Sequence, residues 1–174
     1  MLKLSTASQL LQQNAAKFNQ KKQPIWGYVA IAFNKVDTDR RSKVGPDRLC
    51  AEWIIKNGGA IRTVEAPNIL FKKYNSLPVD TTKMRLKVID ASHASIMKIG
   101  LEHFDGCHFI DKVIFHNCEH LEEDGLEYIV HLRNSLLHLQ VSGCYNIEDE
   151  GLKVIDTLMN KEFLSGFYKD VKLL

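Results

Sequence analysis

The sequence predicts an α/β fold: a short leucine-rich-repeat solenoid of parallel strands plus helices, capped by a small N-terminal helical module. Two stretches that begin at Cys118 and Cys144 match each other at a spacing of 26 residues. Each has an apolar residue three positions after its cysteine, a Gly-Leu pair further on, and two alternating apolar residues before it. A fixed period of this size indicates stacked repeats, because one unit cannot bury its apolar side alone.

The alternating apolar residues before each cysteine predict short strands. Val113 and Phe115 in one copy, and Leu139 and Val141 in the next, should point into a shared interior. In each repeat we expect a turn at the small buried cysteine, followed by a helix that the Gly-Leu segment opens. The two strands should therefore lie side by side, with their intervening residues on one exposed concave face.

Less regular segments flank these two copies. A weaker copy precedes them, with Ser92 at the cysteine position and a one-residue insertion before its later anchors; its other positions are Ile89, Ile96, Gly100, Leu101 and Phe104. Residues 60–78 are expected to form an irregular first repeat broken by prolines, and residues 163–174 to cap the stack.

The N-terminal module is predicted from two helical patterns. Residues 25–33 are almost entirely apolar and should form a helix packed on the residues after it. A second helix should begin at Pro46, whose fixed φ suits a first turn, and end at Gly58, which accepts a left-handed cap conformation. The charged segment 37–43 between them is expected to be a solvated loop, or else a contact for a large partner.

Charge is distributed unevenly along the 174 residues, whose net charge is +2. Residues 1–24 contain four lysines and no acidic residue, a composition typical of a mitochondrial presequence, with a disordered basic tail as the alternative. The predicted domains are therefore this presequence (1–24), the helical module (25–60) and the repeat domain (61–174). Without the presequence the chain is slightly acidic, which argues against nucleic-acid binding.

No apolar run approaches the roughly 20 residues needed to cross a bilayer, so any membrane association should be peripheral. Of the four cysteines, Cys118 and Cys144 fit the repeat as small buried residues. Cys50 and Cys107 show no zinc-type spacing. We therefore expect free thiols in a reducing compartment, with disulfides as the less favoured alternative.

The concave face carries the side chains that could support chemistry. We expect Asp90, His116 and Ser142 to form one row across the sheet, and Val88, Ile114 and Gln140 another. An Asp, a His and a Ser in one row suggest a hydrolase, but a serine within a regular strand lacks the strained turn and oxyanion donors of such enzymes. We interpret the face as a polar surface that binds a partner, and predict no enzymatic activity. The predicted partner-binding residues are Arg40, Arg41, Lys43, Asp90, Ile114, His116, His138, Gln140 and Ser142.

All seven histidines lie between His93 and His138. Placed on the repeats, they fall on different faces and cannot converge on one zinc ion, so we predict that they are surface residues. The chain also contains no Walker-type or dinucleotide-binding glycine motif.

Several segments together resemble one protein family. They are Trp26-Gly27, 33–40, 44–48, Glu52-Trp53, 73–78, 89–91 and 96–100. In these segments the chain resembles the family of mitochondrial ATP synthase subunit s, also called coupling factor B. The likeness extends from about residue 25 to the end of the repeats.

The resemblance implies a non-catalytic protein, peripheral on the matrix face of the inner membrane, that associates with ATP synthase subunits and supports proton conduction. It also implies a magnesium ion held by the backbone carbonyls of Gly58 and Ser92, which suits a hard cation that prefers oxygen ligands. A sister group implies an alternative, assembly of respiratory complex I. A ubiquitin-ligase substrate adaptor is a third hypothesis, although the chain has no F-box. The sequence leaves open whether the chain forms a homodimer.

Overall fold

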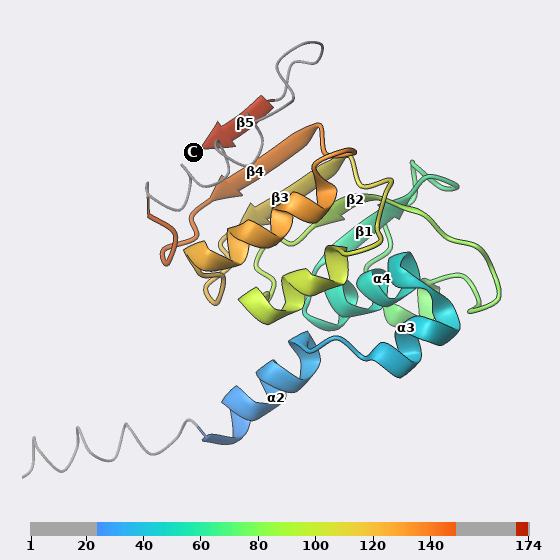
Figure 1. The fold of residues 1–174 in the computed structure, drawn as a ribbon, viewed down its shortest axis with the longest axis horizontal. Coiled ribbons are helices and arrows are strands. Elements are labelled where there is room, and N and C mark those ends of the chain that lie inside the picture. Colours follow the sequence, from blue (N-terminus) through green and yellow to red (C-terminus); the bar gives the residue numbers. More distant parts are fainter. Residues whose placement is uncertain (1–23, 149–169, 174) are drawn as a thin grey trace, which may run out of the picture. The chain divides into compact units, whose positions relative to one another are not determined.

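The computed structural model describes residues 24–148 and 170–173, with side chains from residue 27 to residue 148. The chain divides into two compact units, Met1–Ala32 and Phe33–Leu174. The elements appear in Figure 1; η marks a 3₁₀-helix. They are α2 (Pro24–Asn34), α3 (Thr38–Val44), α4 (Pro46–Lys56), β1 (Ala60–Thr63), η2 (Tyr74–Ser76), β2 (Leu86–Asp90), η3 (Lys98–Phe104), β3 (Lys112–His116), η4 (Glu123–Leu132), β4 (His138–Ser142) and β5 (Asp170–Leu173).

The fold is mixed α/β. The described strands form one sheet in the order β1-β2-β3-β4-β5, in which β1 is antiparallel to β2 and every later neighbour is parallel. Val113 pairs with Leu139 and Phe115 pairs with Val141, and all four side chains are buried. The predicted adjacency of these strands, and the inward direction of their apolar residues, are confirmed.

The register of the weaker copy was predicted incorrectly. Asp90 pairs with Ile114, so counting along both chains brings Ala94, rather than Ser92, to the position of Cys118. Ala94 is buried, whereas Ser92 is half-buried and donates its hydroxyl to Asp90. Each of the three turns has a left-handed residue just before its small buried one; these are His93, Asn117 and Gly143.

Residues 60–78 do not form a parallel repeat. α4 is followed by Gly58, whose φ of +94° reverses the chain, so β1 runs back along β2 in the antiparallel direction. The segments that begin with Gly-Leu pairs lie in 3₁₀-helices, η3 and η4. Gly100 allows a close approach there, because a Cβ at this position would lie 2.6 Å from the Trp53 ring.

The charged segment 37–43 was predicted to be a loop, but it contains helix α3. Asp37 is the reason, since its side chain accepts a hydrogen bond from Arg40 N at 2.8 Å and caps the helix. The helical state of the other two predicted segments is confirmed, although Tyr28, Ile31 and Phe33 of the first are exposed and not packed as expected. The two helices are α2 over the apolar stretch and α4 with Pro46 at its start.

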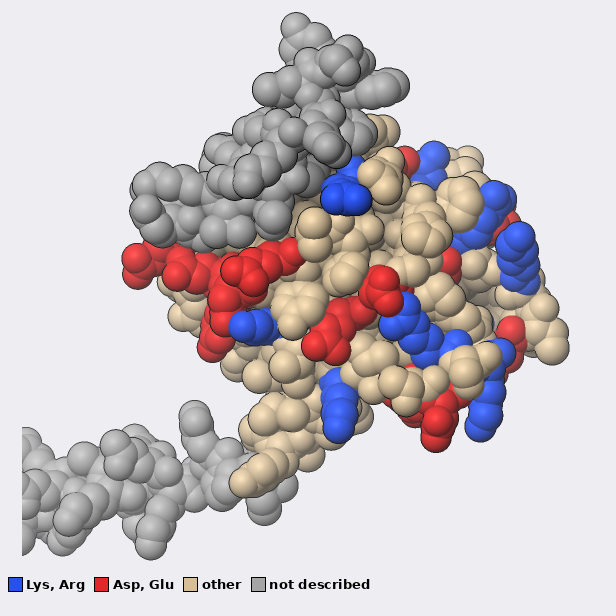
Figure 2. All heavy atoms as spheres, viewed as in Figure 1, with Lys and Arg blue, Asp and Glu red and all other residues tan. Residues whose placement is uncertain are grey.

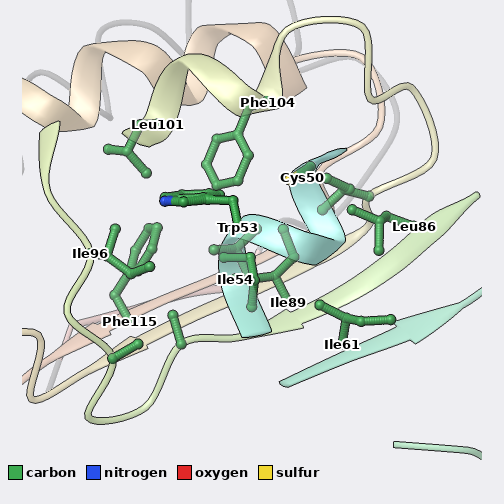
Figure 3. Close-up of a cluster of buried hydrophobic side chains, with 14 of the residues drawn as sticks. Cys50, Trp53, Ile54, Ile61, Leu86, Ile89, Ile96, Leu101, Phe104 and Phe115 are labelled. Atoms are coloured by element: carbon green, nitrogen blue, oxygen red, sulfur yellow. The ribbon is translucent and has the colours of Figure 1, made fainter. Parts of the chain in front are cut away.

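The core of the second unit is centred on Trp53 of α4. Figure 3 shows its ring between Leu101 and Phe104 of η3 and the sheet residues Ile89 and Phe115. The indole Nε1 donates to Asn34 Oδ1 at 3.1 Å, and the same oxygen accepts from Met97 N at 2.9 Å. Asn34 is fully buried, and these bonds tie the end of α2 to α4 and to the loop after β2.

Some predictions fall outside the described residues. They are the presequence at 1–23, the Gly-Leu part of the third copy within 149–169, and the first part of the predicted cap. Residues 170–173 of that cap form β5. The proposed domain boundaries stay predictions. Among the described residues, no helix has the length and apolar character needed to cross a membrane.

Candidate interaction surface

The face of the sheet opposite the buried strand residues carries the candidate site. Side chains alternate along each strand, so in β3 Val113 and Phe115 are buried while Lys112, Ile114 and His116 are half-buried. β4 shows the same alternation, with His138 and Gln140 half-buried and Ser142 almost covered at its end. Parallel pairing in register places equivalent residues about 4.8 Å apart across this face.

The rows on this face differ from the predicted rows because β2 is shifted by two residues relative to β3. Asp90 lies beside Ile114, which lies beside Gln140; Val88, Lys112 and His138 form the next row. His116 pairs with Ser142, as expected. The predicted row of Asp90 with His116 was wrong because two fewer residues separate β2 from β3 than separate β3 from β4.

Hydrogen bonds link the polar side chains at the carboxyl ends of the strands. His116 Nδ1 lies 2.9 Å from Ser142 Oγ, which also accepts from Gln140 Nε2 at 3.2 Å. The His93 and His116 rings meet edge to face, with their centroids 5.4 Å apart. Asp90 is engaged separately, since its Oδ1 accepts from Ser92 N and Ser92 Oγ.

This arrangement does not assemble a hydrolase triad. Asp90 binds Ser92 and pairs with Ile114, so it is not placed to orient His116. Ser142 is only 7% exposed and lies at the end of a regular strand. What the face offers is a set of side chains fixed by the backbone ladder, which suits binding.

Two of the three predicted residues of the helical module are held by ion pairs within the molecule. Arg40 contacts both Glu52, at 2.7 Å, and Asp80, at 2.8 Å, and Arg48 contacts the same two carboxylates. Arg41 donates to the Asp105 side chain at 2.7 Å. Lys43 is exposed. The candidate partner-binding residues therefore lie in two separate places, one on the sheet face and one on α3.

Glu52 is the centre of the ion-pair network and is 1% exposed. Burial would raise the pKa of its carboxyl, but hydrogen bonds from Arg40 and Arg48 outweigh burial and hold the pKa below its ordinary value. Sequence reasoning missed this network. The spacing of Arg48 and Glu52, four residues apart on one helix, was the available signal.

Of the two candidate metal ligands, one precedes the paired residues of β1 and the other follows those of β2. Ala60 pairs with Asp90, and continuing outward along both chains leads to Gly58 and Ser92. Ser92 N donates to the Asp90 side chain, so it does not continue the ladder towards Gly58. In the described part of the chain, no hydrogen bond is made to either carbonyl oxygen. Carbonyl oxygens are a ligand type that a hard cation accepts, and two of them would supply only part of its coordination shell.

Histidines and cysteines form no metal centre within residues 27–148, where no three His, Cys, Asp or Glu side chains are grouped to hold an ion. The four cysteines are buried free thiols, as predicted. His103 was wrongly placed on the surface, because it is 4% exposed and stacks on Trp53 at 4.8 Å. Burial lowers the pKa of His103 to about 4.

Comparison with characterised proteins gives these surfaces a context. Proteins named ATP synthase subunit s, mitochondrial, from Bos taurus, Homo sapiens and Mus musculus align over 144 residues at 33, 34 and 33% identity. Each alignment covers 80% of this chain and 72% of the relative. The chain belongs to the ATP synthase subunit s family. The resemblance seen in the sequence is confirmed, and no family model matches the chain.

Membership of the subunit s family applies to most of the described residues. The shared length is long enough to include the helices, the strand ladder and the turns that carry the candidate surface. The name of these relatives refers to the mitochondrial ATP synthase, which makes that complex the candidate partner for this surface.

Proposed function

We propose that this chain is an accessory factor of the mitochondrial ATP synthase, without enzymatic activity, that binds synthase subunits and supports proton conduction. Its place would be peripheral, on the matrix side of the inner membrane. The observation that carries the proposal is membership of the subunit s family over 80% of the chain. The absence of an assembled triad among the described face residues is consistent with a binding role.

The exposed sheet face is the proposed docking surface. A short leucine-rich-repeat solenoid would present its strands in this way, as a rigid array of side chains on one face. Ile114 supplies a half-buried apolar centre, and the polar side chains of Asp90, Gln140 and His138 surround it. Because the backbone ladder fixes these groups, little conformational entropy is lost when a partner binds.

Lys43 and Arg41 on α3 form a second proposed contact. Lys43 is exposed, and the described residues provide it with no ion pair. Arg41 is held by Asp105 but is still partly exposed. Arg40 contributes indirectly, because its contacts with Glu52 and Asp80 fix the position of α3.

Magnesium is part of the proposal through the carbonyl oxygens of Gly58 and Ser92. An ion bound there would supply a fixed positive charge that joins the end of α4 to the turn after β2. Its proposed role is structural. Thermal unfolding should then shift to higher temperature when magnesium is added and return when a chelator is added; an unchanged midpoint would contradict the role.

Affinity purification of the tagged full-length chain from mitochondria tests the proposed partner. We expect synthase subunits to be recovered, and recovery should decrease when Ile114 and Gln140 are both changed to arginine. A control that adds even more positive charge carries arginine at Glu122 and Glu127, which are exposed on and beside η4. Recovery of complex I subunits without synthase subunits would contradict the proposal and support the assembly role.

A further inference from the structure

Basic and acidic residues are concentrated in different parts of the chain. Residues 56–87 contain seven basic and two acidic residues, whereas residues 98–148 contain three basic and nine acidic ones. In Figure 2, Lys and Arg side chains gather on the right of the view, and an acidic group that includes the η4 region gathers on the left. None of the sheet-face residues proposed to bind synthase lies within residues 56–87, so the basic side requires its own explanation.

The basic side is dominated by the β1–β2 segment, residues 64–85. Its two acidic residues are already neutralised, since Glu65 binds Arg85 at 2.8 Å and Asp80 binds Arg40 and Arg48. Three lysines are left exposed, and the described residues form no ion pair with them. They are Lys72, Lys73 and Lys83. The segment therefore presents positive charge outward.

Large apolar side chains project from the same segment between these lysines. Ile69 is 55% exposed, Tyr74 40% and Val79 70%. Cations adjoin the aromatic rings of this side, with Lys56 5.4 Å from the Tyr74 ring centre and Arg85 5.0 Å from that of Phe109, itself 46% exposed. Exposed apolar groups interleaved with unpaired lysines suit the interface of an anionic bilayer.

The exposure of these residues is imposed by the structure. Phe71, Leu77 and Met84 of the same segment are buried in the core, and Phe71 bridges Ile61 of β1. Arg48 also donates to Pro78 O, directly before Val79. Because the segment is anchored at these points, Ile69, Tyr74 and Val79 are kept out of the core.

We propose that the β1–β2 segment is the surface by which this protein contacts an anionic lipid bilayer. The lysines would lie at the phosphate groups, and Ile69, Tyr74 and Val79 would enter the interfacial region. An acidic protein surface with apolar pockets is the alternative occupant, and the vesicle experiment below separates it from a bilayer. The inference deepens the peripheral membrane association proposed above, and it also leaves the sheet face free for a protein partner.

Vesicle co-sedimentation of the full-length chain tests this inference without any synthase present. The probes are phosphatidylcholine vesicles and vesicles in which part of the phosphatidylcholine is replaced by phosphatidylglycerol. We expect preferential binding to the anionic vesicles, weakened by salt. Changing Lys72, Lys73 and Lys83 to serine should reduce the partition coefficient by about a hundredfold, roughly fivefold per lysine. Changing Ile69 and Val79 to serine should reduce it several-fold.

The matched control removes the same charge elsewhere by changing Lys35, Lys98 and Arg133 to serine, and it should bind much more tightly than the first triple variant. Thermal unfolding checks that all variants are folded. Equal losses in both triple variants, or no preference of the unaltered chain for anionic vesicles, would overturn the inference. It would also be overturned if the Lys72, Lys73 and Lys83 variant bound vesicles normally but no longer recovered synthase subunits, because the segment would then bind protein. Since vesicles contain no synthase, failure of the proposed function leaves this result interpretable.

Discussion

Arg40 and Arg48 of the helices and Lys112 and His138 of the strand ladder are used in opposite ways. In the helical residues, Arg40 and Arg48 turn towards the nearly inaccessible carboxylate of Glu52 and hold the helices together. In the strand ladder, Lys112 and His138 stand on the exposed face, and the described residues give them no ion pair. Lys112 and His138 are therefore docking candidates, whereas Arg40 and Arg48 are structural ties.

Trp53→Ala should have the largest effect on stability. The side chain is 2% exposed, stacks on His103 and meets Phe104 edge to face at 5.8 Å. Its removal should lower the free energy of unfolding by about 3–5 kcal/mol, because a large cavity is left in the core. Urea denaturation measures this change. Tyr145→Ala is the control, since Tyr145 is 83% exposed and its loss should change stability by at most about 0.5 kcal/mol.

Glu52→Gln should be next in size. The substitution leaves Arg48, which is 7% exposed, without a neutralising carboxylate on its own helix, and should cost about 3 kcal/mol. Glu65 and Arg85 form an ion pair in which both side chains are partly exposed. The change of Glu65 to Gln should therefore lower the free energy of unfolding by less than about 1 kcal/mol. Chemical denaturation of both variants gives the contrast. Similar losses at the two positions would mean that the helical network is not a structural tie.

His103 makes the helical side sensitive to acid. Its pKa is lowered to about 4 in the folded protein, against about 6.5 in the unfolded chain, because burial disfavours the charged ring. Above pH 6.5 the ring is neutral in both states, and the stability is fully present. As the pH falls from 6.5 towards 4, the unfolded state binds the proton first and stability is lost.

The expected loss at pH 5 relative to pH 7 is about 2 kcal/mol from this residue. Urea denaturation at the two pH values should show it, and the His103→Gln variant should lose correspondingly less over the same interval. His120→Gln is the matched control because His120 is exposed in a turn. If His103→Gln and the unaltered chain lost the same stability, burial of a neutral histidine would not be the cause.

Charge removal on the ladder should have the smallest effect on stability. Lys112→Ser and His138→Ser should each change the free energy of unfolding by less than about 0.5 kcal/mol. Thermal and urea unfolding measure this directly. A loss of about 2 kcal/mol, well above the ordinary range for surface changes, would show that the face is held by its charged residues, and the contrast with the helical residues would disappear.

The strands and the inward residues were predictable because the pattern that specifies them lies within short stretches of sequence. Val113 and Phe115 alternate in the same way as Leu139 and Val141, 26 residues later. α4 was predictable because Pro46 and Gly58 mark its ends. The register of β2 was not, since both Ser92 and Ala94 are small and only the left-handed turn residue distinguishes them. The residues of the candidate face in β3 and β4 were therefore predicted correctly, but the residue beside Asp90 was not.

The helical residues were less predictable because their contacts are distant in sequence. Arg40 forms an ion pair with Asp80 of the β1–β2 segment, and Arg41 forms one with Asp105, directly after η3. Burial of His103 depends on Trp53, fifty positions earlier. Local composition indicated a solvated loop over 37–43, and the Asp37 cap was the one local signal for a helix.

The central claim is that the sheet face binds the synthase, and reconstitution tests it most directly. Mitochondrial membranes depleted of the native factor would receive the unaltered chain, the variant with arginine at Ile114 and Gln140, or the control with arginine at Glu122 and Glu127. We predict that the unaltered chain and the control restore proton-driven coupling, while the face variant stays folded and fails to restore it. Full restoration by the face variant would contradict the account.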